Sequence, residues 1–162
     1  VFGQDDLLYA LPKSNPYRRL NYKDIKNRIL KAIAHCDRLL VTTEPLAEVY
    51  QYIADEIRII PNYLERRRWT NLSSQCRQGR KPRVGWAGAG QHQGDLQLIM
   101  PLVKTLAEKE VVEWIFLGLC PEALQPYVTE NHPMVSFDQY PAKIASVNLD
   151  LAIAPLENHP FN

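Results

Sequence analysis

The sequence predicts an α/β protein made of two units, each built around a parallel β-sheet. Short apolar runs of strand length alternate with helical patterns along almost the whole chain of 162 residues. Strands separated by helical crossovers pair in parallel and carry helices on both faces of the sheet. A polar stretch at residues 63–82 interrupts the alternation once, which indicates two units rather than one.

Three strands and two helices are expected before this polar stretch. The strands are the apolar runs at residues 1–2, 37–43 and 57–60, and the last ends at Pro61, which supplies no amide to a ladder. The helices cover residues 24–36 and 44–55. Apolar residues recur at helical spacing in both: Ile25, Ile29, Leu30 and Ile33 in the first, and Leu46, Val49, Tyr50 and Ile53 in the second.

Residues 63–82 are polar, mixed in charge and without clear periodicity, so they are expected to link the two units. The basic run "ERRRW", residues 65–69, is interpreted as a solvated part of this linker. The expected boundaries are therefore 1–62 for the first unit, 63–82 for the linker and 83–162 for the second unit.

The second unit repeats the alternation. Strands are expected at residues 83–88, 112–119, 134–137 and 149–154, the last of them buried, and helices at 94–110, 121–128 and 141–147. The longest helix carries an apolar stripe of Leu96, Ile99, Val103 and Leu106. Pro101 is expected to kink this helix or to begin its second half.

Composition narrows the classes of function. The formal net charge of +1 gives no global argument for nucleic acid or a membrane surface as a partner. Cys36, Cys76 and Cys120 share no metal-ligand spacing and are expected to be free thiols in a reducing compartment. No apolar run approaches the roughly 18 residues that span a bilayer. Both ends of the sequence cut into strand patterns, so a piece of a longer protein is expected.

Ligands of open α/β sheets bind beyond the carboxyl ends of the strands, which selects the loops after Trp86, Leu117, Phe137 and Ala154. The first of these loops reads "GAGQHQGD", residues 88–95. Glycines there let backbone amides approach an anion, and the next helix offers its positive N-terminus. A phosphate site is therefore expected, with a tight turn that binds no ligand as the alternative. Asp95 is expected to cap the helix.

Two common phosphate motifs do not fit this loop. Gly88, Gly90 and Gly94 are spaced one residue too widely for the dinucleotide fingerprint, and the next strand ends "FLGL" without an acidic residue. No Gly-Lys-Ser/Thr is present, which excludes a P-loop. The glycine spacing and the missing acidic residue both disfavour a nicotinamide-dependent oxidoreductase.

Further polar residues lie at the expected ligand edge. His92 either faces a phosphate or a sugar, or is a solvated loop side chain. Asp5 and Asp6 either bind a metal, act as a base or hold substrate hydroxyls, or they form a cap and a turn. The last strand ends in a polar cluster suited to a hydroxyl-rich ligand: Pro155, Glu157, His159 and Asn162.

The ordered set "VGWAGAGQHQGDL", "FLG" and "VSFDQYPAKIASVNLDLAIAPLENHPFN" resembles the nucleotide-sugar-binding half of group 1 glycosyl transferases, which are retaining enzymes of the GT-B type. "DDLLYALPKSNP", "CDRLLVTTEPLAEVY" and "IRIIPNYLE" resemble the end of the acceptor-side domain of that family. The resemblance covers nearly the whole chain and is greatest to bacterial members that act on surface polysaccharides or glycans. It implies two Rossmann-like units of GT-B type, both incomplete in this chain.

The resemblance also implies residue roles. The loop that faces the donor diphosphate would be formed by Gly88, Gly90, Gln91 and His92. Phe137 and Asp138 would lie beside the nucleobase. The loop under the donor sugar would hold Pro155, Glu157, His159 and Asn162. Asp5 and Asp6 match an acceptor-side pair most loosely.

The implied activity is transfer of a sugar from a nucleoside-diphosphate sugar to an acceptor hydroxyl, with no metal or other cofactor required and a cleft that closes by domain movement. The implied partners are the nucleotide-sugar donor and a glycan or lipid-linked acceptor, without nucleic acid. The implied location is cytoplasmic and compatible with peripheral attachment to the inner face of the membrane. The chain by itself is expected to have little or no activity. The alternative is a non-catalytic nucleotide-binding or scaffolding module of a larger assembly.

Overall fold

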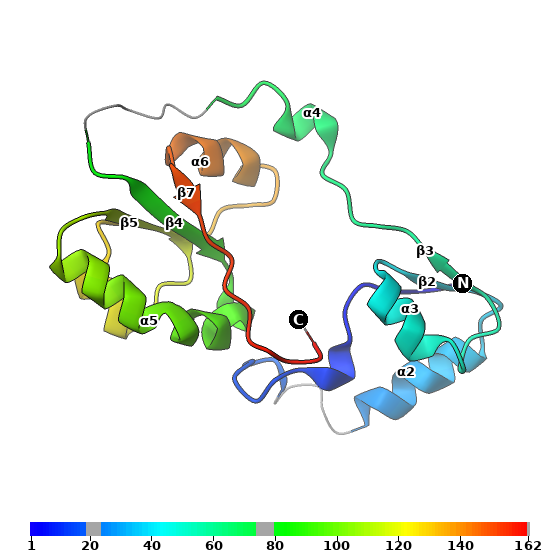
Figure 1. Cartoon of the computed structure of the whole chain (residues 1–162). Coiled ribbons are helices and arrows are strands. Elements are labelled where there is room, and N and C mark those ends of the chain that lie inside the picture. Colours follow the sequence, from blue (N-terminus) through cyan, green and yellow to red (C-terminus); the bar gives the residue numbers. More distant parts are fainter. Residues whose placement is uncertain (19–23, 74–79, 162) are drawn as a thin grey trace. The chain divides into compact units, whose positions relative to one another are not determined.

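The computed structural model describes residues 1–18, 24–73 and 80–161, and it shows an α/β protein with two all-parallel sheets in a Rossmann-like arrangement (Figure 1). The chain divides into two compact units. The first consists of Val1–Tyr63 together with the residues from Asn158 onward, and the second of Leu64–Glu157. The α/β class expected from the alternating pattern is confirmed.

The first unit has a three-stranded sheet with the order β1-β2-β3. Its strands are β1 (Phe2–Gln4), β2 (Leu39–Val41) and β3 (Ile57–Ile59), and its helices are the 3-10 helix η1 (Leu8–Ala10), α2 (Ile25–Ala34) and α3 (Glu44–Tyr50). In the register, Leu39 lies between Phe2 and Ile57. Since the strands run in chain order and in parallel, their carboxyl ends lie at one edge of the sheet.

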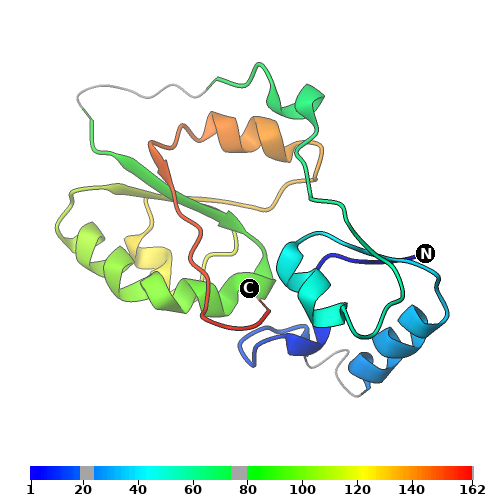
Figure 2. The same ribbon diagram turned by 45° about the vertical axis from the view of Figure 1, so that its right-hand side comes forward.

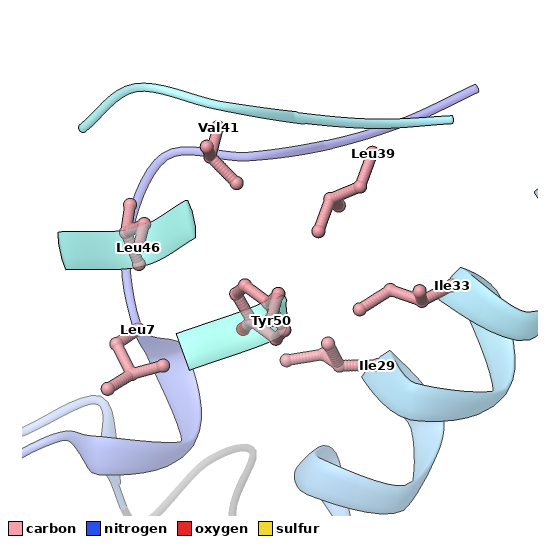
Figure 3. Close-up of a cluster of buried hydrophobic side chains, with 7 residues drawn as sticks. All are labelled: Leu7, Ile29, Ile33, Leu39, Val41, Leu46 and Tyr50. Atoms are coloured by element: carbon pink, nitrogen blue, oxygen red, sulfur yellow. The ribbon is translucent and has the colours of Figure 1, made fainter. Parts of the chain in front are cut away.

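Figure 3 shows the core of this unit, in which side chains from α2 and α3 meet those of β2. Ile29 and Ile33 are buried on α2, as the helical stripe predicts, and the ring of Tyr50 is fully buried between the elements. The stripe expected on the second helix is narrower than predicted. Because α3 ends at Tyr50, Ile53 falls in the following turn and is 43% exposed.

The second unit has a four-stranded sheet with the order β6-β5-β4-β7. The strands are β4 (Arg83–Gly88), β5 (Glu113–Gly118), β6 (Glu130–His132) and β7 (Leu151–Ala152). The helices are α4 (Arg66–Trp69), α5 (Gln93–Glu108) and α6 (Tyr140–Ser146), with the 3-10 helices η2 (Gly90–His92) and η3 (Glu122–Tyr127). Across the sheet, the chain adds β5 and then β6 on one side of β4, and it adds β7 on the other side. The direction of winding therefore reverses beside β4.

Helices cover both faces of this sheet: α5 lies on one face and α6 on the other (Figures 1 and 2). The middle residues of β4 and β5 are accordingly buried without alternation. The core is built by these strands with α5 and η3: Val84, Trp86, Leu96, Val103, Trp114, Phe116 and Leu124. The predicted stripe of α5 is confirmed, and α5 continues through Pro101 as one helix.

The third strand of the second unit does not lie where the sequence predicts it. Residues 134–137 were expected to form this strand, but it consists of Glu130–His132, and the chain after it is a loop. Pro133 follows the strand directly and has no amide for the ladder, so pairing with β5 ends before the apolar residues begin. Polar side chains suit the strand because it lies at the edge of the sheet.

The last strand also differs from expectation. A buried strand was predicted at residues 149–154, but β7 has two residues, and Leu151 is 56% exposed. Among the described strands, β7 pairs only with β4, through Leu151 opposite Val84 and Ala152 opposite Gly85. A strand with a neighbour on one side only leaves part of its surface to solvent.

Among the helices of the described residues, none reaches both the length and the hydropathy of a membrane span.

We predict that Gly118→Ala destabilises the second unit by more than about 2 kcal/mol. Gly118 has φ +100°, and a Cβ there would lie 2.3 Å from the carbonyl oxygen of Gly88. Urea unfolding followed by the fluorescence of the buried Trp86 and Trp114 measures this loss.

The matched control is Gly90→Ala, because a Cβ at Gly90 meets no atom within 4 Å. We expect this variant to remain within about 1 kcal/mol of the original stability. Equal losses in the two variants would contradict the close packing assigned to the ends of β4 and β5.

Candidate functional site

The glycine-rich loop lies at the carboxyl end of β4 and leads through η2 into α5. Its two predicted glycines have different surroundings. A Cβ at Gly88 would lie 2.6 Å from the ring of Trp86, whereas Gly90 faces open space. The His92 amide donates to the Ala89 carbonyl at 3.1 Å, which closes the turn before α5. Gly88 therefore serves packing, and Gly90 leaves room beside the start of α5.

Asp95, in the first turn of α5, joins this loop to the segment that follows β7. One carboxylate oxygen, Oδ2, lies 2.8 Å from Nδ1 of His92, and the other, Oδ1, accepts the Glu157 amide hydrogen bond at 2.7 Å. The residue is 4% exposed. The sequence predicted a helix cap here, but the N-cap position is His92, and the Asp95 side chain bridges two loops instead.

Burial of a carboxylate is costly unless its oxygens are hydrogen-bonded. Asp95 has a partner for each oxygen, and it lies at the positive end of a sixteen-residue helix. These three contributions offset the cost of removing the charge from water. Sequence reasoning gave Asp95 only a capping role and missed that it bridges the two loops. Its position three residues after the loop histidine was a signal, but its second partner is 62 residues away.

The segment after β7 approaches the loop after β4 because the two strands are neighbours. The amide of Ile153 donates to the Gly85 carbonyl at 2.9 Å, and the Glu157 amide reaches Asp95. Pro155 and Glu157 are half-buried there. The structure thus brings together the predicted Gly88, Gly90 and His92 with Glu157 at the point where the strand order reverses. In open parallel sheets this point is where ligands bind.

Two residues of the predicted terminal cluster are not part of this arrangement. His159 belongs to the first unit, where its Nδ1 accepts the Phe161 amide hydrogen bond at 3.2 Å. Asn162 lies outside the described residues. Gln91 lies in η2, between Gly90 and His92.

Phe137 and Asp138 lie in the loop after β6, and both contact α4. The Arg68 guanidinium lies 5.2 Å from the centre of the Phe137 ring and is paired with the carboxylates of Asp138 and Glu65. The hydrogen bond with Asp138 raises the pKa of the Arg68 guanidinium. Phe137 is 79% exposed.

A second contact accompanies this one. The rings of Trp69 and Tyr140 meet edge to face, with centres 6.1 Å apart, and burial raises the pKa of the Tyr140 hydroxyl. We call the contacts of Arg68 and Trp69 with residues 137–140 the α4 clasp. The run "ERRRW" was interpreted as a solvated linker, and the α4 clasp corrects this: two of its side chains dock on the loop that starts α6.

The first unit has its own cavity at the carboxyl edge of its sheet. This cavity of about 360 Å³ is lined by residues from all three strand ends: Gly3, Gln4, Asp5, Leu40, Val41, Thr42 and Ile60. The loop after β1 is held by two side chains, since Thr42 Oγ1 donates to the Asp5 carbonyl at 3.1 Å and Gln4 Nε2 donates to the Asp6 carbonyl at 2.7 Å. Asp5 therefore lies at the cavity on an anchored backbone, while Asp6 is the next residue along and exposed.

Other cavities lie at the opposite edge of the second sheet. One of them, about 680 Å³, is lined by residues that precede β4, β5 and β6, among them Lys81, Val112 and Thr129. A smaller one of about 330 Å³ surrounds Arg83, which is paired with Glu113 and Glu130. These cavities are at the amino ends of the strands, away from the edge at which parallel sheets bind ligands.

No three His, Cys, Asp or Glu side chains in the described ranges gather closely enough to hold a metal ion. Cys36 and Cys120 are free thiols, as predicted, and burial raises the pKa of the Cys120 thiol. Cys76 lies outside the described residues.

Comparison of the sequence with models of known protein families and with curated protein sequences finds no match.

We predict that Arg68→Ala opens the α4 clasp and makes Trp69 more accessible to acrylamide. Trp86 and Trp114 are buried, so quenching of tryptophan fluorescence reports mainly on Trp69. Loss of the guanidinium removes the pairing with Asp138 and the contact with Phe137 together.

Arg67→Ala is the matched control, because Arg67 lies on the same helical turn and is exposed. We expect its quenching to equal that of the unsubstituted chain. Unchanged quenching in Arg68→Ala would show that α4 is held by Trp69 alone.

Proposed function

We propose that the protein is a glycosyltransferase of the GT-B type that moves a sugar from a nucleoside-diphosphate sugar to an acceptor hydroxyl, with retention and without a metal. The observation that carries the proposal is the bond of the Glu157 amide to Asp95 at 2.7 Å. It joins the glycine loop and the exit of β7 where the strand order reverses. Two neighbouring loops at this point can hold a diphosphate and the sugar attached to it.

The donor side follows from the chemistry of the leaving group. When the glycosidic bond breaks, negative charge grows on the diphosphate and positive charge on the sugar ring. In the proposed site, the positive end of α5 stabilises the diphosphate, and Gly90 leaves room for it beside η2. Pro155 and Glu157 lie under the sugar. Phe137, 79% exposed, offers a ring face to the nucleobase.

The acceptor side is assigned to the cavity of the first unit. Its walls are mostly apolar, and Asp5 places a carboxylate at its rim. Such a surface suits a sugar or a lipid-linked glycan, whose carbon-bound faces pack on apolar groups while hydroxyls donate to the carboxylate. A nucleotide-sugar donor fits a cytoplasmic location, and a lipid-linked acceptor fits peripheral attachment to the inner face of the membrane.

A non-catalytic nucleotide-binding or scaffolding module is the second candidate. The same two loops at the reversal of the strand order favour it, because they can bind a nucleotide without turnover. The two candidates differ in whether the nucleoside diphosphate is released.

The deciding experiment offers UDP-, GDP-, dTDP- and ADP-sugars separately, without divalent metal, to the chain and to a longer polypeptide that includes it. Mass spectrometry follows the nucleoside diphosphate. We expect release from one donor and loss of donor binding by at least about tenfold in Gly90→Leu. A Cβ at Gly90 meets no atom within 4 Å, so the new side chain enters the open space beside η2.

Binding of a nucleotide with every donor left intact would support the non-catalytic module. If the chain neither binds a nucleotide nor releases a nucleoside diphosphate, the loop is only a turn.

A separate substitution tests whether the acceptor binds in the cavity of the first unit. A Cβ at Gly3 meets nothing within 4 Å, so Gly3→Leu should fill the cavity without disturbing β1. We expect donor binding, measured by calorimetry, to stay unchanged while transfer to acceptor falls by at least about tenfold. Unchanged transfer would remove the acceptor from this cavity, and weakened donor binding would show that the variant disturbs more than the cavity.

A further inference from the structure

We propose that Asp95 is a positioning residue that fixes the proton of the neutral His92 ring on Nδ1, so that Nε2 accepts a hydrogen bond from a ligand hydroxyl, while the same carboxylate holds the segment after β7. The inference rests on the proposed function for the identity of the ligand, but not for the positions of the proton and the loop.

The proton position follows from the partner of each ring nitrogen. Asp95 Oδ2 lies 2.8 Å from Nδ1 of His92, and a carboxylate can only accept a hydrogen bond. Nδ1 therefore carries the proton. In a neutral imidazole the other nitrogen is then an acceptor. Nε2 of His92 has no partner among the described residues, and the side chain is 37% exposed, so this acceptor is open to a ligand.

The chain contains a histidine with the opposite arrangement. His132 Nε2 lies 2.9 Å from a Glu130 carboxylate oxygen, and its Nδ1 lies 3.1 Å from the Lys143 ammonium. An ammonium can only donate, so Nδ1 accepts and Nε2 carries the proton. His132 is thus an internal reference for the tautomer that His92 is not expected to adopt.

The two oxygens of Asp95 have separate tasks, which makes one substitution informative. Oδ1 accepts the Glu157 amide hydrogen bond at 2.7 Å, and Oδ2 accepts from His92. In Asp95→Asn, the amide oxygen can keep the bond to Glu157, and the new NH₂ group then faces Nδ1 of His92. Since NH₂ only donates, Nδ1 must give up its proton, and the ring changes to the Nε2–H tautomer.

The change of tautomer would alter the hydrogen bond between His92 and a ligand. With the proton on Nε2, His92 offers a donor where it offered an acceptor. A hydroxyl that donated to Nε2 must then rotate or lose its bond. A site built to pair with a hydroxyl loses affinity when its partner atom is mismatched, because the buried polar groups are left unpaired. We expect a loss of about tenfold, which corresponds to about 1.4 kcal/mol.

The first measurement needs no ligand. Nitrogen-15 NMR of the imidazole rings, recorded on the neutral form of each ring, distinguishes the two tautomers. We expect Nδ1–H for His92 and Nε2–H for His132 in the unsubstituted chain, and Nε2–H for both in Asp95→Asn. Hydrogen exchange of the Glu157 amide should stay slow in Asp95→Asn and become fast in Asp95→Ala.

Nε2–H for His92 in the unsubstituted chain, or an unchanged tautomer in Asp95→Asn, would overturn the positioning role. Fast exchange at Glu157 in Asp95→Asn would overturn the division of tasks between the two oxygens. Asp95→Ala also tests stability, because its unfolding in urea shows whether a change in exchange is local to Glu157 or global.

The second measurement uses calorimetry with UDP-glucose, GDP-mannose, dTDP-glucose and ADP-glucose, and with the four nucleoside diphosphates alone. A loss in Asp95→Asn that is seen only with a nucleotide sugar assigns the hydroxyl to the donor sugar. An equal loss with the nucleoside diphosphate assigns it to the ribose. Unchanged affinity in a variant whose tautomer has inverted would overturn the role of Nε2 as an acceptor.

Absence of binding to the unsubstituted chain would overturn the proposed function and the ligand hydroxyl together. The NMR result would still decide the positioning role of Asp95, so the two failures are distinguishable.

Discussion

Strand β4 pairs with β5 on one side and with β7 on the other, and the second unit is organised around this double pairing. The strand that enters the sheet first becomes an inner strand, and the last strand joins on its free side. The loops at the carboxyl ends of β4 and β7 are therefore neighbours, although the strands are more than 60 residues apart in the sequence. The side chain of Leu149, just before β7, packs over Gly85, where a Cβ would lie 2.4 Å from it.

The buried carboxylate of Asp95 holds these two neighbouring loops in a fixed position relative to each other. Adjacent loops without a shared contact would move independently, because exposed loops have few interactions that hold them. The hydrogen bonds of Asp95 with His92 and with the Glu157 amide link the two loops through one side chain. Two side chains act similarly at the carboxyl edge of the sheet in the first unit, where Gln4 and Thr42 hold the backbone of the loop after β1.

The α4 clasp shows why a charged segment is hard to interpret from composition. Three adjacent arginines look alike in the sequence, yet their surroundings differ: Arg68 is half-buried against Phe137 and Asp138, and Arg66 and Arg67 are exposed. A guanidinium combines a flat apolar face with a fixed charge, so it can contact a ring and a carboxylate at once. Which of the three does so depends on the loop after β6, 70 residues further along the chain.

The sequence by itself determined the fold class, the alternation of strands and helices outside residues 63–82, the buried faces of α2 and α5, and the glycine loop at the end of β4. These features depend on spacing within a short stretch of chain, which periodicity records directly. The position of strand β6 was predicted wrongly because its residues are polar and its place in the sheet is set by pairing with β5. Only the tertiary structure decided the bridging role of Asp95 and the docking of Arg68. Each requires a partner that is distant in the sequence, and local patterns carry no information about which distant groups a folded sheet brings within hydrogen-bond distance.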